Sequence, residues 1–218
     1  MYRYFEDEIK EVKEALLNMS LYVEDMIYNS VLALKTTDTD LSKKIIEEDD
    51  EIDKIEIQID EKCTEIIMRH HPLARDLRFV LATLKINNDL ERIADLAVDI
   101  AWRVIEISRG ENGKITRDIE EMGIKVKDML RNSIKSLTEE NYELAKEVIT
   151  SDKEIDALKN GIIEEILRNT DKVNLRKNLS LILAVRHLER IADHCVNISE
   201  DVIYILKARV VKHHKENL

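Results

Sequence analysis

Very little in this chain interrupts a helix, and this scarcity limits its possible folds more than any other feature. Pro72 is the single proline among 218 residues, and only four glycines occur. Aromatic residues make up 4% of the chain and charged residues 36%. Such a composition, dominated by Leu, Ile, Ala, Glu, Lys and Asp, is typical of helical proteins. The sequence therefore predicts an all-α fold with long helices.

Apolar residues recur at intervals of three and four through six segments, which is the spacing of amphipathic helices. Pro72, which has no amide donor, ends the second segment. Thr39 or Asp40 is expected to cap the second helix by accepting bonds from free backbone N–H groups. The six helices are expected to span approximately Phe5–Lys35, Leu41–His70, Ala74–Ser108, Thr116–Leu137, Tyr142–Arg168 and Val173–Ala208.

The last three segments repeat the plan of the first three. The hexapeptide LERIAD occurs at Leu90–Asp95 and again at Leu188–Asp193. A unit of about 100 residues is too long for a solenoid repeat, and it suits a three-helix bundle. We therefore predict six long helices in two tandem, pseudo-symmetric three-helix bundles. The expected units are residues 1–110 and 114–209, followed by a polar tail over 210–218.

Charge and hydropathy exclude several classes of protein. The formal net charge of −11 disfavours nucleic acid as a partner, because a protein that neutralises phosphates needs a basic face. No run approaches 18 apolar residues, and the start MYRYFEDEIKEV lacks the apolar region of a secretory signal. Cys63 and Cys195 lie within expected helices and form no CxxC pair. We therefore expect a cytoplasmic protein without a transmembrane segment.

The acidic residues of LERIAD lie off the apolar face of their helix. With Glu91 at 0° on a helical wheel, Asp95 falls near 40° and Asp99 near 80°, whereas the apolar residues gather between about 180° and 280°. These side chains are therefore expected to be available to solvent or to a ligand. The second copy places three side chains equivalently: Glu189, Asp193 and Asn197.

Neighbouring helices carry matching acids one turn apart. Asp49 and Asp53 on the second helix correspond to Asp152 and Asp156 on the fifth, in each case 103 residues apart. Two adjacent helices with such pairs can bring four to six oxygens together, and clustered carboxylates repel one another unless a cation neutralises them. Hard or borderline metal ions prefer oxygen ligands of this kind. The candidate metal ligands are Glu91, Asp95, Asp99, Glu189, Asp193, Asn197, Asp49, Asp53, Asp152 and Asp156.

The same spacing also fits a purely structural interpretation. Acidic residues four apart are common on solvated helix faces, and Glu91 or Glu189 can simply pair with an adjacent arginine. His187 and His194 flank the second motif and are expected to be surface residues or to support metal ligands. No Glu-x-x-His di-iron signature, phosphate-binding loop or GxSxG elbow occurs, so we expect no enzymatic activity.

Three stretches resemble the signature segments of the PhoU family of phosphate-signalling regulators. They are EEDDEIDKIEIQIDEKC, HPLARDLRFVLATLKINNDLERIADLAVDIA and LSLILAVRHLERIADHCVNISEDVIYIL. The resemblance runs from the first helix to about Leu206 and is most specific at ERIAD in both halves, at DLR and at NISEDVIY. It implies two three-helix bundles related by approximate internal symmetry.

The resemblance also implies a function. PhoU proteins are cytoplasmic negative regulators of phosphate uptake and phosphate-starvation signalling, and they connect the ATPase subunit of a phosphate ABC transporter to a membrane sensor histidine kinase. Association with the membrane would then occur through these partners. Long bundles with exposed edges further suggest a homodimer.

Several PhoU proteins bind iron or zinc clusters through paired E(D)xxxD motifs, which correspond here to Glu91/Asp95, Glu189/Asp193, Asp49/Asp53 and Asp152/Asp156. Fe or Zn is therefore expected, with Mn or Mg as alternatives and no organic cofactor. Asp99 in the first half corresponds to Asn197 in the second, so the two sites are expected to differ in affinity or metal count.

The leading hypothesis is a regulatory adaptor that acts by protein–protein contact. Two alternatives remain open. The first is a metal-dependent phosphoesterase in which carboxylates and two ions activate water. The second is a structural helical scaffold whose acidic stripes are only solvated.

Overall fold

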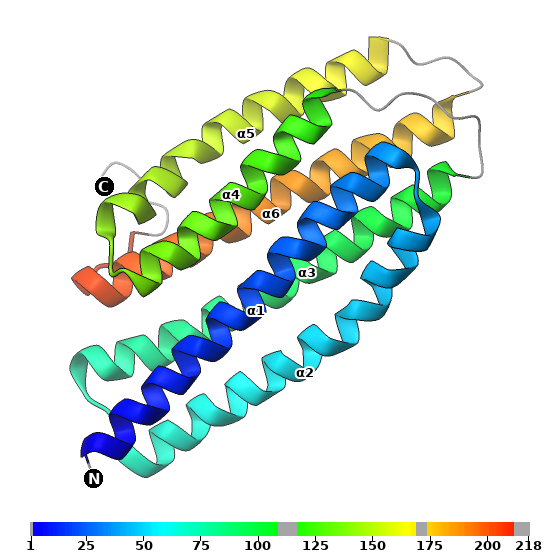
Figure 1. The fold of residues 1–218 in the computed structure, drawn as a ribbon. Helices are drawn as coiled ribbons and strands as arrows, with labels where there is room; N and C mark the ends of the chain where they lie inside the picture. Colours follow the sequence, from blue (N-terminus) through cyan, green and yellow to red (C-terminus); the bar gives the residue numbers. More distant parts are fainter. Residues whose placement is uncertain (1, 109–116, 169–173, 212–218) are drawn as a thin grey trace.

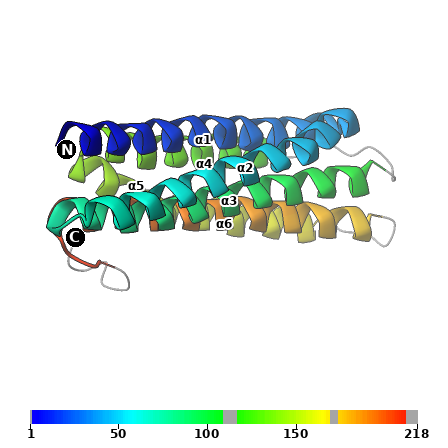
Figure 2. The same ribbon diagram turned by 90° about the horizontal axis from the view of Figure 1, so that it is seen from below.

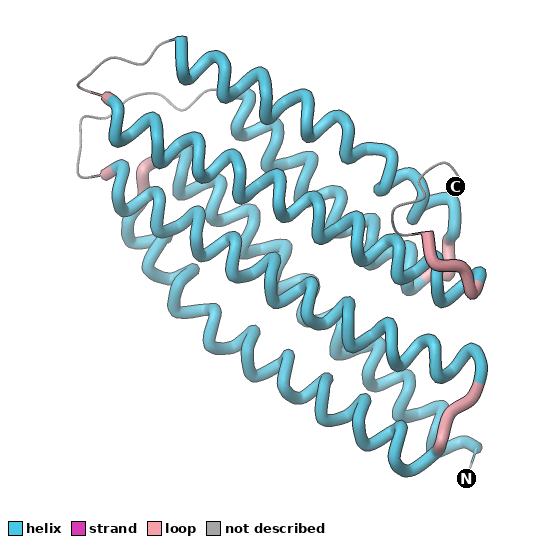
Figure 3. The backbone as a smooth tube through the Cα atoms, turned by 180° about the vertical axis from the view of Figure 1, so that it is seen from behind, coloured by secondary structure: helices cyan, strands magenta, loops and turns pink. Residues whose placement is uncertain are grey.

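The computed structural model describes residues 2–108, 117–168 and 174–211, and over this part of the chain it contains six helices and no strand. The prediction of an all-α fold is confirmed. The helices are α1 (Tyr2–Thr36), α2 (Thr39–His70), α3 (Ala74–Ile107), α4 (Arg117–Thr138), α5 (Tyr142–Arg168) and α6 (Leu175–Lys207). Figure 3 shows the short loops that join α1 to α2, α2 to α3 and α4 to α5.

The two halves of the chain form two three-helix bundles that lie side by side (Figure 1). Helices α1, α2 and α3 pack together in the first bundle, and α4, α5 and α6 in the second. Between the bundles, α3 packs against α6 and α1 packs against α4. Figure 2 shows α1 on the opposite side of the molecule from α3 and α6. Helices α2 and α5 therefore lie at the two outer edges.

Both contacts between the bundles are antiparallel. Across α1 and α4, Lys35 pairs with Glu120 and Glu24 pairs with Arg131, so residue numbers rise along one helix as they fall along the other. Across α3 and α6, Lys85 pairs with Asp201 and Glu106 accepts a hydrogen bond from Ser180 in the same antiparallel sense. This arrangement is the pseudo-two-fold symmetry that the sequence duplication predicts.

A single continuous hydrophobic core joins the two bundles, with buried residues from all six helices. The apolar residues of both LERIAD copies belong to it and are fully buried: Leu90, Ile93, Ala94, Leu188, Ile191 and Ala192. The duplicated motif is therefore a core element on its apolar side. Burying these side chains stabilises the folded state by about 25 cal/mol for each Å² of apolar surface removed from water.

Asp38 caps α2, and the expectation of Thr39 or Asp40 is wrong. The side chain of Asp38 accepts hydrogen bonds from the backbone N–H groups of Asp40 (3.0 Å) and Leu41 (2.9 Å). Asp38 has an extended backbone, as an N-cap residue requires, whereas Thr39 is already helical. At the other end, His71 adopts a left-handed conformation and donates its backbone N–H to the carbonyl of Ile67, so α2 ends just before Pro72.

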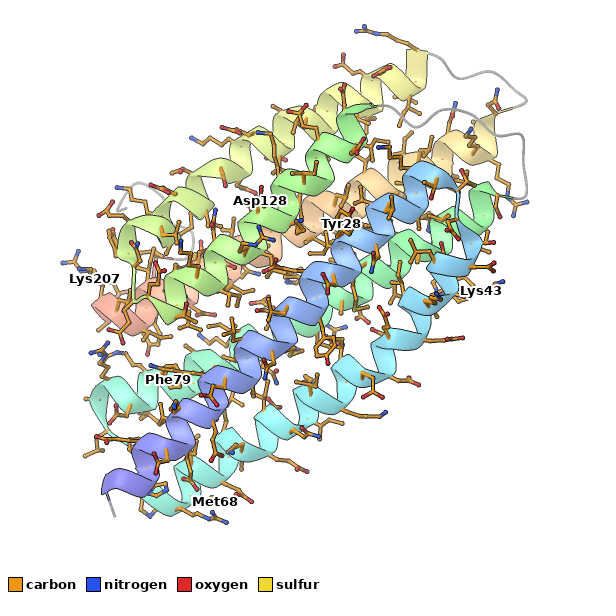
Figure 4. All side chains as sticks on the ribbon, in the orientation of Figure 1. Tyr28, Lys43, Met68, Phe79, Asp128 and Lys207 are labelled. Carbon is orange, nitrogen blue, oxygen red and sulfur yellow. The ribbon has the colours of Figure 1, made fainter. Side chains whose placement is uncertain are left out.

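The other helix ends agree with the expectations to within a few residues, and α5 has the expected bounds. The expected starts at Thr116 and Val173 lie outside the described residues, as does most of the tail over 210–218. Within the described part of the chain, no helix is long and apolar enough to cross a membrane. Figure 4 shows the charged side chains Lys43 and Asp128 projecting outward from α2 and α4.

Candidate functional site

Carboxylates from α2 and α3 lie near one another where these two helices pack together. This first acidic cluster comprises Asp49, Asp53 and Glu56 of α2 and Glu91 and Asp95 of α3. Burial raises the pKa of Asp49 to about 6, with further contributions from the charges of Asp95 and Asp53. Burial also raises the pKa of Glu91, and the charge of Asp95 adds to this effect. The two pairs predicted on neighbouring helices are therefore near enough for their charges to affect one another.

Arg92 neutralises only part of the first acidic cluster. Its Nη1 atom donates to Oδ2 of Asp95 at 3.0 Å, and its Nε atom lies 3.3 Å from Oε2 of Glu91. The second contact has the distance of an ion pair but not the geometry of a hydrogen bond, and this buried Oε2 atom has no hydrogen-bond partner in the described structure. Arg92 is itself half exposed, so solvent screens its charge. The cluster keeps an excess of negative charge.

A second acidic cluster lies between α5 and α6. It comprises Asp152 and Asp156 of α5 and Glu189 and Asp193 of α6. Burial raises the pKa of Asp193, and the charges of Glu189, Asp152 and Asp156 raise it further. The charges of the two helices therefore affect one another in this half as well.

Unlike the first acidic cluster, the second contains a lysine that contacts both helices. The Nζ atom of Lys159 donates to Oδ1 of Asp156 at 2.7 Å and to Oε1 of Glu189 at 3.1 Å. The hydrogen bond to Asp156 is the largest cause of the raised pKa of Lys159. The ammonium group therefore supplies positive charge at the point where α5 meets α6.

Asp99 and Asn197, the remaining candidate ligands, lie at the interface between α3 and α6. Oδ2 of Asp99 is 3.7 Å from Nδ1 of His187, and Nδ2 of Asn197 donates to Oδ1 of Asp89 at 3.4 Å. The two pairs occupy equivalent positions in the two halves, since Asp99 corresponds to Asn197 and Asp89 to His187. His194 also contacts Oδ1 of Asp89, at 2.7 Å. The structure thus groups these residues with each other across the interface.

His187 and His194 are mostly buried and are not surface residues. Their side chains are only 13% and 20% exposed because α3 covers this side of α6. Burial lowers the pKa of His187, while the charge of Asp99 opposes this effect. The amphipathic pattern of α6 alone could not reveal this, because the covering helix is almost 100 residues away in the sequence.

The donor atoms fit a hard cation better in the first acidic cluster than in the second. The first has five carboxylates, and one of them, Glu91, has a buried Oε2 atom that accepts no hydrogen bond in the described structure and is paired with the half-exposed Arg92. Such a set of oxygen ligands favours a divalent ion. The second already has the ammonium group of Lys159 between two of its carboxylates. Among the described residues, no group of three or more His, Cys, Asp or Glu side chains is arranged closely enough to coordinate an ion. Rotation of the partly exposed carboxylates would therefore have to accompany binding.

Sequence reasoning did not identify Lys159 as part of the site. The signal was present, because Lys159 and Glu56 are 103 residues apart, the same separation as Asp49 and Asp152. Glu56 is therefore replaced by a lysine in the second half. Only the packing of α5 against α6 brings Lys159 into contact with Glu189.

Comparison with known proteins identifies a matching protein family. The profile of the PhoU domain matches residues 16–104 and again residues 119–202. The chain belongs to the PhoU family. Each match covers parts of three helices, so the family domain coincides with the duplicated unit.

Relatives of similar length support this family assignment. The "Phosphate-specific transport system accessory protein PhoU homolog" of Clostridium acetobutylicum is 34% identical over 96% of this chain and 97% of that protein. The corresponding protein of Escherichia coli is 28% identical over 96% of this chain and 88% of its own length.

Solved PhoU structures share the fold of this chain. The crystal structure of PhoU from Pseudomonas aeruginosa has a TM-score of 0.90 at 33% identity and covers 94% of this chain and 100% of that one. The phosphate transport system regulatory protein PhoU from Streptococcus pneumoniae has a TM-score of 0.89 at 25% identity and covers 95% and 99%. The tandem three-helix architecture is therefore that of the family.

Proposed function

We propose that this protein is an accessory protein of a phosphate-specific transport system and a negative regulator of phosphate uptake and phosphate-starvation signalling. The observation that carries the proposal is the match of the PhoU domain to both halves, together with a relative of nearly equal length that is described as a phosphate-specific transport system accessory protein. The fold agrees with a regulatory role, since long helices present extended faces to other proteins. The protein acts by contact and performs no covalent chemistry.

The proposed partners are the ATPase subunit of a phosphate ABC transporter and a membrane sensor histidine kinase. The protein works in the cytoplasm as a homodimer and reaches the inner membrane surface through these partners. The absence of a membrane-spanning helix from the described residues is consistent with such peripheral association. The formal charge of −11 favours basic partner surfaces over anionic ones.

The acidic faces are proposed to bind metal ions, with iron or zinc preferred and manganese or magnesium as alternatives. A bound cation would neutralise carboxylates that otherwise repel one another and would link two helices of a bundle. The residues that would hold it in the first half are Asp49, Asp53, Glu91 and Asp95. The equivalent residues of the second half are Asp152, Asp156, Glu189 and Asp193.

The regulatory role is tested by deleting the gene and restoring it on a plasmid. We expect the deletion strain to take up more phosphate under phosphate-replete conditions and to express phosphate-starvation genes, with both effects reversed by the wild-type gene. Radiolabelled phosphate uptake and a transcriptional reporter measure these changes. Unchanged uptake together with unchanged transcription would contradict the proposal.

The partners are tested by pull-down from phosphate-replete and phosphate-starved cells, followed by mass spectrometry. We expect the transporter ATPase subunit to be recovered with the tagged protein in the replete condition. A tagged six-helix protein of unrelated sequence serves as the control. Recovery of neither the ATPase nor a sensor kinase would disprove the adaptor mechanism.

Nothing in the described structure favours the phosphoesterase over the adaptor. Among the described residues, the carboxylates of the two acidic clusters are flanked by Arg92 and Lys159, and no nucleophile or phosphate-binding loop accompanies them. Turnover of a phosphate ester by metal-loaded protein, abolished by Asp95→Ala and Asp193→Ala, would reverse this preference.

A further inference from the structure

The two acidic clusters differ in charge at one equivalent position. Glu56 in α2 lies three residues after Asp53, and Lys159 in α5 lies three residues after Asp156. The backbone positions match, but the charge changes from negative to positive. This exchange alters the local charge by two units between two halves that match the same family domain.

In the second acidic cluster, the ammonium group of Lys159 lies between carboxylates of α5 and α6, where a metal ion would otherwise neutralise them. It bridges Asp156 on α5 and Glu189 on α6, at 2.7 and 3.1 Å, and the side chain is only 18% exposed. Charge-assisted hydrogen bonds of this length are among the stronger polar contacts in proteins. A cation tethered to the chain is also present at high effective concentration, so a free ion must compete with it.

The first acidic cluster has no such internal ammonium group on the described residues of α2. Glu56 stands at the equivalent position, and burial, with the charges of Asp60 and Asp53, raises its pKa. Glu91, the counterpart of Glu189, keeps a buried Oε2 atom that accepts no hydrogen bond within the described structure. Glu189 therefore accepts a hydrogen bond from a lysine of the neighbouring helix, whereas the Oε2 atom of Glu91 has an ion-pair contact with Arg92 of its own helix and no hydrogen bond.

We propose that Lys159 is a built-in cation that replaces a metal ion in the second acidic cluster, so that this protein binds a divalent ion in its first half only. This inference rests on the metal-binding part of the proposed function. It changes the expected number of metal sites in each chain from two to one, because a symmetric duplication would otherwise suggest two equivalent sites. The second bundle is then held together by its own side chains, whereas the first responds to the available metal.

Reciprocal charge exchange in the full-length, chelator-treated protein tests the inference, with Mn²⁺ alone as the probe. Electron paramagnetic resonance of unbound Mn²⁺ gives the number of ions bound per chain. We expect Lys159→Glu to bring that number to about twice the wild-type value and Glu56→Lys to abolish binding. Two exposed residues of the same helices provide controls of equal charge change, and we expect Lys153→Glu and Glu61→Lys to retain the wild-type number.

Single neutralisations locate the wild-type site. We expect Asp53→Asn to weaken Mn²⁺ binding at least tenfold and Asp156→Asn to change it less than twofold. Equal weakening by both substitutions would overturn the inference, and so would a Lys159→Glu protein that gains no Mn²⁺. Absence of Mn²⁺ binding from the wild type and from every variant would overturn it as well.

Thermal unfolding supplies a readout that does not depend on counting ions. In the presence of chelator, we expect Lys159→Glu to lower the Tm of the protein and Glu56→Lys to raise it. Addition of Mn²⁺ should restore the Tm of the Lys159→Glu protein. It should leave the Tm of the Glu56→Lys protein unchanged. If Lys159→Glu fails to fold, Lys159→Met removes the ammonium group without adding a negative charge and should still create the second site. A Tm of Lys159→Met that does not respond to Mn²⁺ would then contradict the inference.

Failure of this inference is distinguishable from failure of the proposed function. If Mn²⁺ binds both clusters equally while deletion of the gene still derepresses phosphate uptake, only the role of Lys159 is wrong. If the deletion has no phosphate phenotype but the charge exchange behaves as expected, the asymmetric cation site stands and the regulatory assignment fails.

Discussion

Gly123 and Gly161 are both helical, but their surroundings are opposite. A Cβ atom added to Gly123 would lie 2.6 Å from Cγ2 of Val31, where α4 crosses α1, whereas nothing lies within 4 Å of a Cβ atom added to Gly161. The missing side chain of Gly123 therefore allows the two bundles to approach closely. Gly161 has no comparable packing role.

Replacing each glycine by alanine separates these two situations. We expect Gly123→Ala to destabilise the protein by about 1–3 kcal/mol, because a short β-branched side chain must move to relieve the overlap. Gly161→Ala is the matched control and should raise stability by up to about 1 kcal/mol through helix propensity. Urea unfolding followed by circular dichroism measures both. Equal effects of the two substitutions would show that the bundles are not packed closely at Gly123.

Asp49 makes the metal-free protein less stable at neutral pH. Its pKa in the folded protein is about 6, above the ordinary value of 3.8, mainly because of burial and secondly because of Asp95. The folded state therefore favours the protonated carboxyl group. The protonated carboxyl group of Asp49 therefore contributes its full stabilisation of the folded state below about pH 3.8, and this contribution is lost as the pH rises through about 6.

Asp49→Asn should accordingly raise the Tm of chelator-treated protein at pH 7.5, and this gain should shrink as the pH falls from 6 towards 4. Thermal melts across this pH range provide the measurement. The exposed residue Glu48 supplies the control, since Glu48→Gln should give a small change with little dependence on pH. A gain for Asp49→Asn that is the same at pH 4 and pH 7.5 would be inconsistent with the raised pKa.

At the scale of elements, the ion pair between Glu24 and Arg131 joins α1 to α4 through a largely buried carboxylate. Nη2 and Nε of Arg131 donate to Oε2 of Glu24 at 2.9 and 3.1 Å, and the Glu24 side chain is only 10% exposed. Removal of the guanidinium group leaves a largely buried carboxylate without these donors. The cost of such an unpaired group exceeds the usual value of an exposed ion pair.

We expect Arg131→Gln to lower the free energy of unfolding by about 1–3 kcal/mol. The double variant with Glu24→Gln should recover part of this loss, because no buried charge remains. Lys10, which pairs with Glu14 on the surface, provides the control, and Lys10→Gln should change stability very little. If Arg131→Gln and Lys10→Gln lower the free energy of urea unfolding equally, the ion pair between Glu24 and Arg131 stabilises the protein no more than an exposed ion pair does.

At the scale of the whole molecule, the shared core links the stability of the two bundles. Buried residues of α1, α3, α4 and α6 belong to the same hydrophobic cluster, so either half alone would expose apolar surface. We expect one cooperative thermal transition, with calorimetric and van't Hoff enthalpies that agree. Differential scanning calorimetry of metal-free protein tests this, and two separated transitions would show that the halves unfold independently.

Local sequence patterns located the helices because a helix depends mainly on its own apolar spacing and breakers. The bounds of α5 agree with the expectation, and the apolar residues of both LERIAD copies are buried as expected. The prediction of Thr39 or Asp40 as the N-cap of α2 is wrong, because Asp38 is the N-cap residue. Asp38, Thr39 and Asp40 all have suitable side chains, and only the extended backbone of Asp38 distinguishes it.

The sequence by itself determined an all-α chain of two matched three-helix units, the family to which it belongs, and the helix faces that carry carboxylates. Only the tertiary structure decided that the bundles lie antiparallel and side by side, that α3 covers His187 and His194, and that Lys159 joins α5 to α6. The physical reason is the range of the interactions. Helix periodicity is set by residues three and four apart, whereas these ion pairs and buried histidines depend on contacts between residues about 30 to 110 positions apart.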